Sequence, residues 1–174
     1  MLQLNFTPFP DLFTERLILR QLNANDANEI FKLRSDEGVN KYLNRPKANS
    51  LEDAKEFINK INNAIQNNES LYWAIMFKEN LSLIGTICLW NISKENYTAE
   101  IGYELIPDYH GKGIMQEAFL KVIEYGFENM KLKRIEAYTH TDNESSIKLL
   151  VKNNFKKIRD VDESEEVVYA LIKE

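Results

Sequence analysis

The N-terminal part of the chain changes from a strand pattern to a helical pattern. The segment "TERLILRQL" (14–22) alternates in the manner of a strand with one buried face. In residues 22–36, Ile30, Leu33 and Arg34 recur at helical spacing, and Asn23 and Asp26 fit a capping box at the start. The pattern predicts a strand followed by a first helix.

A second helix is predicted over residues 49–67. Ser50 is expected to cap it, and Asp53, three residues further on, completes a capping box. The expected buried stripe of this helix consists of Leu51, Ala54, Phe57 or Ile58, Ile61 and Ile65.

The pattern changes to β structure from Leu71. Short polar breaks separate three β-rich runs, "LYWAIMF" (71–77), "LIGTICLWNI" (83–92) and "TAEIGYELI" (98–106). Breaks this short indicate an antiparallel meander. On the third run, alternation places Glu100, Gly102 and Glu104 on one face and Tyr103 on the other, with Ala99, Ile101 and Leu105.

The C-terminal part alternates helices and strands. A helix is predicted from about 113 to 129, since apolar residues recur every three or four positions there. Strand "RIEAYTH" (134–140), helix "NESSIKLLVKN" (143–153) and strands near 155–161 and 167–173 follow. The strand-helix-strand crossover should be right-handed and parallel, which gives a mixed α/β sheet within one domain, residues 1–174. A ligand is expected at the carboxyl end of the strand that enters the crossover.

Composition narrows the function classes. A chain of 174 residues suits one domain, and its net charge of -5 argues against broad nucleic-acid binding, which needs concentrated Lys and Arg. With one cysteine and two histidines, no structural metal is expected. The N-terminus lacks a signal-peptide pattern and no apolar run is long enough to cross a bilayer, so a cytoplasmic protein without a membrane partner is expected.

The stretch "IPDYHGKGIMQEAF" (106–119) places Gly111 and Gly113 between the end of a predicted strand and the start of a predicted helix. A helix N-terminus carries unpaired N–H groups and a partial positive charge, and glycine lets backbone approach an anion closely. The turn therefore has two readings, a simple change of chain direction and a cradle for a phosphate or pyrophosphate. Neither the P-loop spacing nor the three-glycine dinucleotide fingerprint is present, since Gln116 stands where a third glycine is needed.

Three stretches taken together resemble one family. "TERLILRQL", "AEIGYELIPDYHGKGIMQEAF" and "NESSIKLLVKNNF" are similar, in this order and spacing, to the RimJ/RimL branch of the GNAT acetyltransferases. The resemblance implies an acyl-CoA N-acyltransferase fold, a mostly antiparallel sheet of about seven strands with about four helices. It further implies acetyl-CoA as co-substrate, lying where the strand near 97–106 splays from the strand near 134–140.

The resemblance also implies the residues that hold acetyl-CoA. Its pantetheine arm would meet Leu105 and Ile106, with Asn143 and Ser146 on the other side. Its pyrophosphate would sit on backbone amides of the turn and first helical residues, with His110 nearby: Gly111, Lys112, Gly113, Ile114, Met115 and Gln116.

Three positions depart from the family pattern. Asp108 stands where Gln or Arg is frequent, so its carboxylate should point away from the phosphates. Asn154 replaces a glycine, which the fold tolerates because Asn adopts the left-handed conformation of a helix end. Leu150 occupies the position of a tyrosine proton donor, so that donor is missing.

The expected chemistry is attack by a neutral amine on the acetyl thioester. Glu100 and Glu104 share a face but lie about 13 Å apart along the strand, so only one can serve a given amine as base. The resemblance favours Glu100, and water remains an alternative. Ser146 is expected to assist the leaving sulfur, and a backbone N–H near Ile106 to stabilise the oxyanion.

The acceptor stays open. The leading expectation is a protein N-terminal α-amino group, as in ribosomal-protein acetylation; alternatives are a small amine (polyamine, amino sugar or amino acid) and a non-catalytic acyl-CoA-binding module. The acceptor site is expected to form from the first two helices and the loops near 36–49 and 91–97. Dimers are common among relatives, so a homodimer is compatible with the resemblance.

Overall fold

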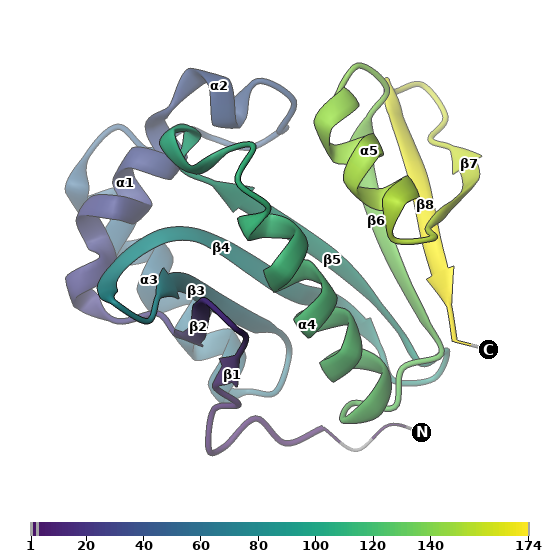
Figure 1. Cartoon of the computed structure of the whole chain (residues 1–174), viewed down its shortest axis with the longest axis horizontal. Helices are drawn as coiled ribbons and strands as arrows, with labels where there is room; N and C mark the ends of the chain where they lie inside the picture. The colour runs from purple at the N-terminus through teal and green to yellow at the C-terminus, as the bar shows by residue number, and fades with distance from the viewer. Residues whose placement is uncertain (1, 3, 174) are drawn as a thin grey trace.

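The computed structural model describes Leu2 and residues 4–173. Its eight strands form one sheet in the order β1-β2-β3-β4-β5-β6-β8-β7 (Figure 1). The strands are β1 (Leu12–Phe13), β2 (Leu17–Gln21), β3 (Leu71–Phe77), β4 (Asn80–Ser93), β5 (Thr98–Leu105), β6 (Arg134–His140), β7 (Lys156–Asp160) and β8 (Glu166–Ile172).

The helices begin where the sequence places their caps. Asn23 and Asp26 form a capping box on the short 3-10 turn η1 (Ala24–Asp26), and Ser50 and Asp53 form another on α3. The helices are α1 (Ala27–Ser35), α2 (Glu37–Asn40), α3 (Leu51–Gln66), α4 (Ile114–Glu128) and α5 (Glu144–Lys152), with a second 3-10 turn, η2 (Pro107–Tyr109), ahead of α4.

Strand pairing follows the predicted topology. β2 through β5 are an antiparallel meander, and β6 pairs antiparallel with β8. The crossover from β5 through α4 to β6 joins two parallel strands, as predicted. The mixed, mostly antiparallel α/β sheet is therefore confirmed.

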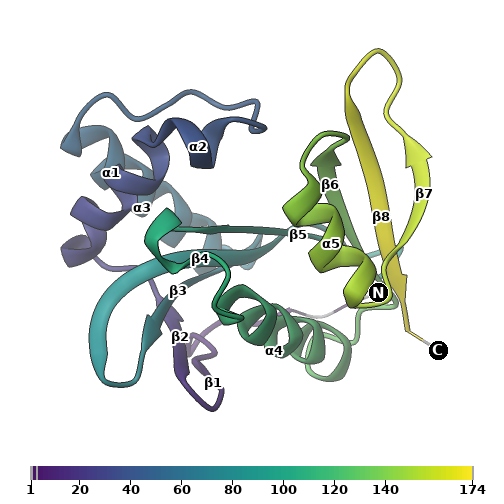
Figure 2. The ribbon, with the colours of Figure 1, turned by 45° about the horizontal axis from the view of Figure 1, so that its top comes forward.

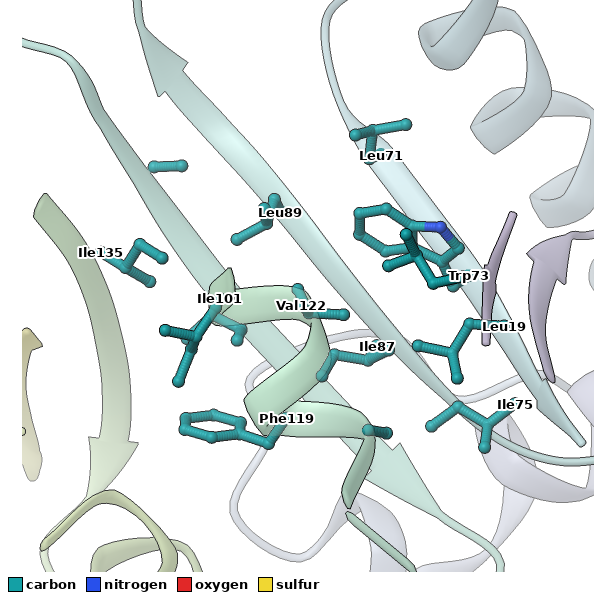
Figure 3. Packing of buried hydrophobic residues seen from close by; sticks show 14 of the residues in the cluster. Leu19, Leu71, Trp73, Ile75, Ile87, Leu89, Ile101, Phe119, Val122 and Ile135 are labelled. Carbon is teal, nitrogen blue, oxygen red and sulfur yellow. The ribbon is translucent and has the colours of Figure 1, made fainter. Parts of the chain in front are cut away.

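Two apolar clusters cover opposite faces of the sheet. In the larger, Phe119 and Val122 of α4 pack onto strand residues that include Trp73 and Ile101 (Figure 3). In the smaller, α1 and α3 pack onto the other face at Ala74 and Leu83. Strand alternation thus sends odd-numbered β5 residues toward α4 and leaves even-numbered ones facing the side of α1 and α3.

β5 and β6 pair over a short length and then separate. Their register comprises three pairs, Thr98 with Arg134, Ala99 with Ile135 and Glu100 with Glu136. Beyond them the two strands diverge, and β6 continues with β8 while β5 continues with β4 (Figures 1 and 2). The predicted splay is present, and it opens at the carboxyl ends of both strands.

Three details differ from the predictions. The sheet has an eighth strand, β1, which was not predicted because it is too short to show an alternating pattern. The fifth helix, α2, has only four residues, fewer than a helical period needs to be recognised. Leu51 is 39% exposed and lies outside the buried stripe of α3, where Ala54, Ile58 and Ile65 are buried.

Within the part of the chain that the structure describes, no helix combines the length and apolarity needed to span a membrane.

Candidate active site

A cavity of about 1010 Å³ occupies the splay between β5 and β6 and extends over the even-numbered face of β5. Ten of the sequence-predicted site residues line it: Glu100, Leu105, His110, Gly111, Gly113, Ile114, Met115, Gln116, Asn143 and Ser146. Ile106 and Lys112 do not. Ile106 instead packs against the cluster formed by α1 and α3.

The glycine turn adopts a conformation that suits glycine. Gly111 and Gly113 both have φ of 73°, in the left-handed region. Gly113 is the N-cap of α4 and supplies no side-chain hydrogen bond, so no side chain of its own satisfies the first N–H groups of the helix. A Cβ added at Gly111 would meet no atom within 4 Å, which leaves the turn open to close approach by an anion.

Neighbouring side chains hold the turn from outside the cavity. Arg16 of the β1–β2 connection donates to the Lys112 carbonyl oxygen at 3.2 Å, and its Nε donates to Glu117 of α4 at 2.7 Å. The Lys112 ammonium folds back onto the Asp108 carbonyl oxygen at 2.8 Å. Asp108 itself is exposed. The turn is thus held by side chains that donate to its backbone carbonyl oxygens.

His110 and Gln116 make contacts that the sequence did not predict. The His110 Nε2 atom lies 2.8 Å from the Leu105 carbonyl oxygen and ties η2 back to the end of β5. The Gln116 side chain exchanges two hydrogen bonds with Asn153, at 2.7 and 2.9 Å, and so links α4 to the end of α5.

The oxyanion donor was expected to be a backbone N–H near Ile106, and the Ile106 N–H itself is not free for that role. That N–H donates to the Ile84 carbonyl oxygen at 2.9 Å, so it belongs to the β4–β5 ladder. Backbone groups alternate in direction along an antiparallel ladder, so the N–H groups of Tyr103 and Leu105 point away from β4, toward the splay.

The start of α5 faces these groups across the cavity. Asn143 caps the helix by accepting from the Ser146 N–H at 3.2 Å, as predicted from its position. The Ser146 hydroxyl lies 2.7 Å from the Tyr103 hydroxyl, which comes from β5. Burial raises the pKa of Tyr103 to about 12, so this phenol stays protonated.

Sequence reasoning missed Tyr103 as a site residue. Alternation correctly placed it on the α4 face of β5, where it packs edge-on against Phe119 with ring centroids 5.2 Å apart. Its hydroxyl nevertheless reaches the cavity, because α5 lies on the same side of the sheet as α4 (Figure 2). Leu150 lies four residues after Ser146 on α5, at the position where many relatives carry a tyrosine. The Tyr103 phenol, next to Ser146, therefore lies near the position of that missing tyrosine.

Glu100 and Glu104 share a face and have different environments. Glu104 pairs with Arg45 and also accepts from Thr86 at 3.4 Å. Glu100 has no such cation among the described residues. Burial raises its pKa to about 7, the carboxylates of Glu136 and Glu166 act in the same direction, and a hydrogen bond from Asn91 only partly opposes them. Glu100 is therefore the carboxylate able to exchange a proton near neutral pH.

The rest of the cavity lies under the N-terminal helices. Its lining includes Arg34, Tyr42, Arg45 and Phe57, so the predicted loop 36–49 contributes strongly. The predicted loop 91–97 contributes Asn91. The Tyr42 ring also packs on His140 at the end of β6, with centroids 5.1 Å apart, and so joins the two halves of the molecule.

A comparison with protein families assigns the chain. Residues 16–156 match the family described as "Acetyltransferase (GNAT) domain". The chain belongs to the GNAT acetyltransferase family. The resemblance drawn from the sequence is confirmed, and the protein is an acetyl-CoA-dependent N-acetyltransferase.

Similar proteins agree with this assignment. "Uncharacterized N-acetyltransferase YoaA" of Bacillus subtilis is 39% identical over 149 residues, covering 86% of this chain and 84% of that protein. "Ribosomal-protein-serine acetyltransferase" of Escherichia coli is 35% identical over 81 residues, 47% of this chain and 45% of that protein. The solved structure of the Microcin C7 self immunity acetyltransferase MccE, in complex with acetyl-CoA and AMP, is 25% identical with a TM-score of 0.81 and covers 91% of this chain and 93% of that one.

No cluster of His, Cys, Asp and Glu suited to a metal ion is found among the described residues. The open, uncapped glycine turn does suit the anionic pyrophosphate of acetyl-CoA.

We expect Gly111→Ala to weaken CoA binding at least about tenfold, because its methyl group would project into the open space of the turn. Gly113→Ala is the comparison variant: Gly113 also lines the cavity and has the same φ of 73°, but its added Cβ would lie 3.6 Å from Arg16 Nη2, so CoA affinity should fall less than in Gly111→Ala. Both variants should lose about 1–2 kcal/mol of stability from left-handed strain. Calorimetric CoA titration and thermal melts separate the two effects. Equal loss of CoA affinity in both variants would contradict this placement.

Proposed function

We propose that this protein acetylates an N-terminal α-amino group of a peptide or protein. The observation that carries the proposal is Glu100, a carboxylate in the cavity whose pKa is raised to about 7. An α-amino group has a pKa of about 7.7–8.0, whereas a lysine side chain has about 10.4. A base of this strength suits the first amine and is poorly matched to the second.

Acetyl-CoA supplies an acetyl group activated as a thioester. We infer that Gly111 and the first N–H groups of α4 hold its pyrophosphate, and that β5 and Asn143 line the path of its pantetheine arm. The N–H groups of Tyr103 and Leu105, which point into the splay, are the candidate donors to the thioester carbonyl oxygen. The Leu105 N–H lies next to Ile106, in the region where the sequence led us to expect the donor.

Proton transfer divides between two sides of the cavity. Glu100 accepts the proton that the attacking amine loses, directly or through one water. Ser146 donates a hydrogen bond toward the leaving sulfur, and Tyr103, 2.7 Å from Ser146, supplies a protonated phenol behind it. The CoA thiol should have a pKa near that of cysteine, about 8.5, so its departure needs only modest assistance from an acid.

Glu104 has a different part in this scheme. Its charge is engaged by Arg45, so it does not compete with Glu100 for the amine proton. The similarity to a ribosomal-protein-serine acetyltransferase over part of the chain supports a protein acceptor. Small amines remain the alternative acceptors to be tested beside it.

The first test is thiol release from acetyl-CoA with a panel of acceptors. The panel contains peptides with free α-amines, the same peptides with blocked N-termini and an internal lysine, a polyamine, an amino sugar and an amino acid. We expect release with free α-amines and little with blocked peptides, because Glu100 matches the α-amine pKa. Release with the small amines alone would replace the proposed acceptor. No release with any amine, alongside a CoA-dependent rise in melting temperature, would indicate a binding module.

The second test is the pH profile of Glu100→Gln with an α-amine peptide. In wild type, log(kcat/KM) should rise below pH 7 with a slope of about two, because both Glu100 and the acceptor amine must lose a proton. In the variant only the amine titrates, so the slope should fall to about one and the rate at pH 7 should fall at least about tenfold. An unchanged slope would remove Glu100 as the base.

Unfolding is a poor explanation for such a loss. The folded pKa of Glu100 lies above its ordinary value of 4.5, so its ionisation reduces folding stability as pH rises from 4.5 to about 7. Glu100→Gln should therefore be at least as stable as wild type at pH 8, which thermal melts can verify.

The third test concerns the leaving-group side. We expect Ser146→Ala to lower kcat about tenfold with little change in the KM for acetyl-CoA, and Tyr103→Phe to lower it less. If Tyr103 acts through Ser146, the double variant should be no slower than Ser146→Ala alone. Multiplicative losses measured by steady-state kinetics would show that the two hydroxyls act independently.

A further inference from the structure

Arg34 is a cavity-lining cation whose charge is left unbalanced. It projects from α1, and its Cζ atom lies 3.9 Å from the centroid of the Phe57 ring on α3. Among the described residues, no carboxylate lies within 4.0 Å of its guanidinium nitrogens. Stacking on Phe57 fixes the guanidinium plane and leaves its edge N–H groups available.

The nearest buried acid is already engaged by another arginine. Arg45 Nη2 contacts Glu104 Oε2 at 2.5 Å, Arg45 Nη1 contacts Oε1 at 3.3 Å, and the Glu104 side chain is only 8% exposed. Arg45 Nε donates to the buried Asn40 at 2.8 Å, which holds this arginine in place. Two guanidinium groups therefore lie near one buried carboxylate, and only Arg45 contacts it.

The burial of Arg34 and the Arg45 guanidinium both disfavour the charged form of Arg34. Burial, and then the neighbouring Arg45 guanidinium, lower the pKa of Arg34 from its ordinary value. Arginine nonetheless stays charged at physiological pH, because its reference pKa exceeds about 12. Lys60 and Glu69 at the cavity wall are exposed and of opposite sign, and Glu100 lies about 13 Å from Glu104 along β5, so the Arg34 end of the cavity keeps an excess of one positive charge. A partly buried charge of this kind favours an anionic partner.

The distance between Glu100, where the amine reacts, and Arg34 limits which kind of anionic group can reach Arg34. Glu100 and Glu104 are four residues apart on β5, about 13 Å at strand spacing, and Arg34 stands at the Glu104 end. An extended peptide advances about 3.3 Å per residue, so the backbone of its third and fourth residues lies roughly 7 and 10 Å from the first. A glutamate side chain at either position extends further and can bring its carboxylate to this region. A polyamine would place a second positive charge beside Arg34 and Arg45.

We propose that Arg34 binds an acidic side chain at the third or fourth residue of the acceptor peptide, while the α-amine of that peptide faces Glu100. The proposal rests on the proposed function and adds to it the sequence class of the acceptor. Phe57 and Tyr72 form the apolar walls beside this anion site, with ring centroids 5.7 Å apart.

Matched peptides test the proposal. Alanine-based peptides with a free N-terminus carry glutamate or glutamine at position two, three or four, and kcat/KM is measured by thiol release. Wild type should prefer glutamate over glutamine about ten- to hundredfold at position three or four, the range of a charge-assisted hydrogen bond, and less at position two. In Arg34→Gln the ratio should fall to about one. Lys55→Gln, which removes an exposed cation from α3, is the control and should keep the wild-type ratio.

The ratio separates recognition from folding, because a partly unfolded variant loses rate on both peptides alike. If Arg34→Gln proves insoluble, Arg34→Lys keeps the charge and should keep a preference for glutamate. Equal rates for glutamate and glutamine peptides in wild type would overturn the anion site while leaving α-amine acetylation intact. A preference that survives in Arg34→Gln would also overturn it. No turnover of any free α-amine would overturn the proposed function together with this inference.

Discussion

The parallel pairing of β5 with β6 ends at Glu100 and Glu136, and the active site depends on that interruption. Buried backbone polar groups are almost always hydrogen-bonded, so a strand that leaves its neighbour needs other partners. β4 satisfies one edge of β5, and the other edge faces a cavity. An extended ligand with amide groups can complete this edge, and we propose that the pantetheine arm of acetyl-CoA does so.

The two faces of β5 give the two sides of the cavity different chemistry. On the α4 side, Tyr103 packs on Phe119 and meets Ser146 of α5. On the other side, Glu100 and Glu104 line the part of the cavity that lies under α1 and α3, where we propose that the acceptor binds. The same residue type serves two purposes there. Arg45 holds the Glu104 side chain in place, while burial, with no such cation in the described part of the chain, raises the pKa of Glu100 to about 7.

Much of the fold could be predicted from local signals. Ser50 and Asp53 mark the start of α3 because a capping box involves residues three apart, and β3 and β6 show their full length as β-rich runs. The Gly111–Gly113 turn could be recognised because a left-handed backbone favours glycine. Leu51 was misplaced, because a residue at the first turn of a helix can satisfy the helical period and still lie beyond the edge of the sheet.

The sequence by itself determined the elements other than β1 and α2, their order, the glycine turn and the family, because each depends on residues close together in the chain. Only the tertiary structure decided which groups of the site are free. The Ile106 N–H is used by Ile84, Tyr103 reaches Ser146, and Arg45 reaches Glu104 across 59 positions while Arg34 stays without a carboxylate among the described residues. Protonation and charge balance depend on burial and on partners brought from distant segments, and no local pattern encodes those distances.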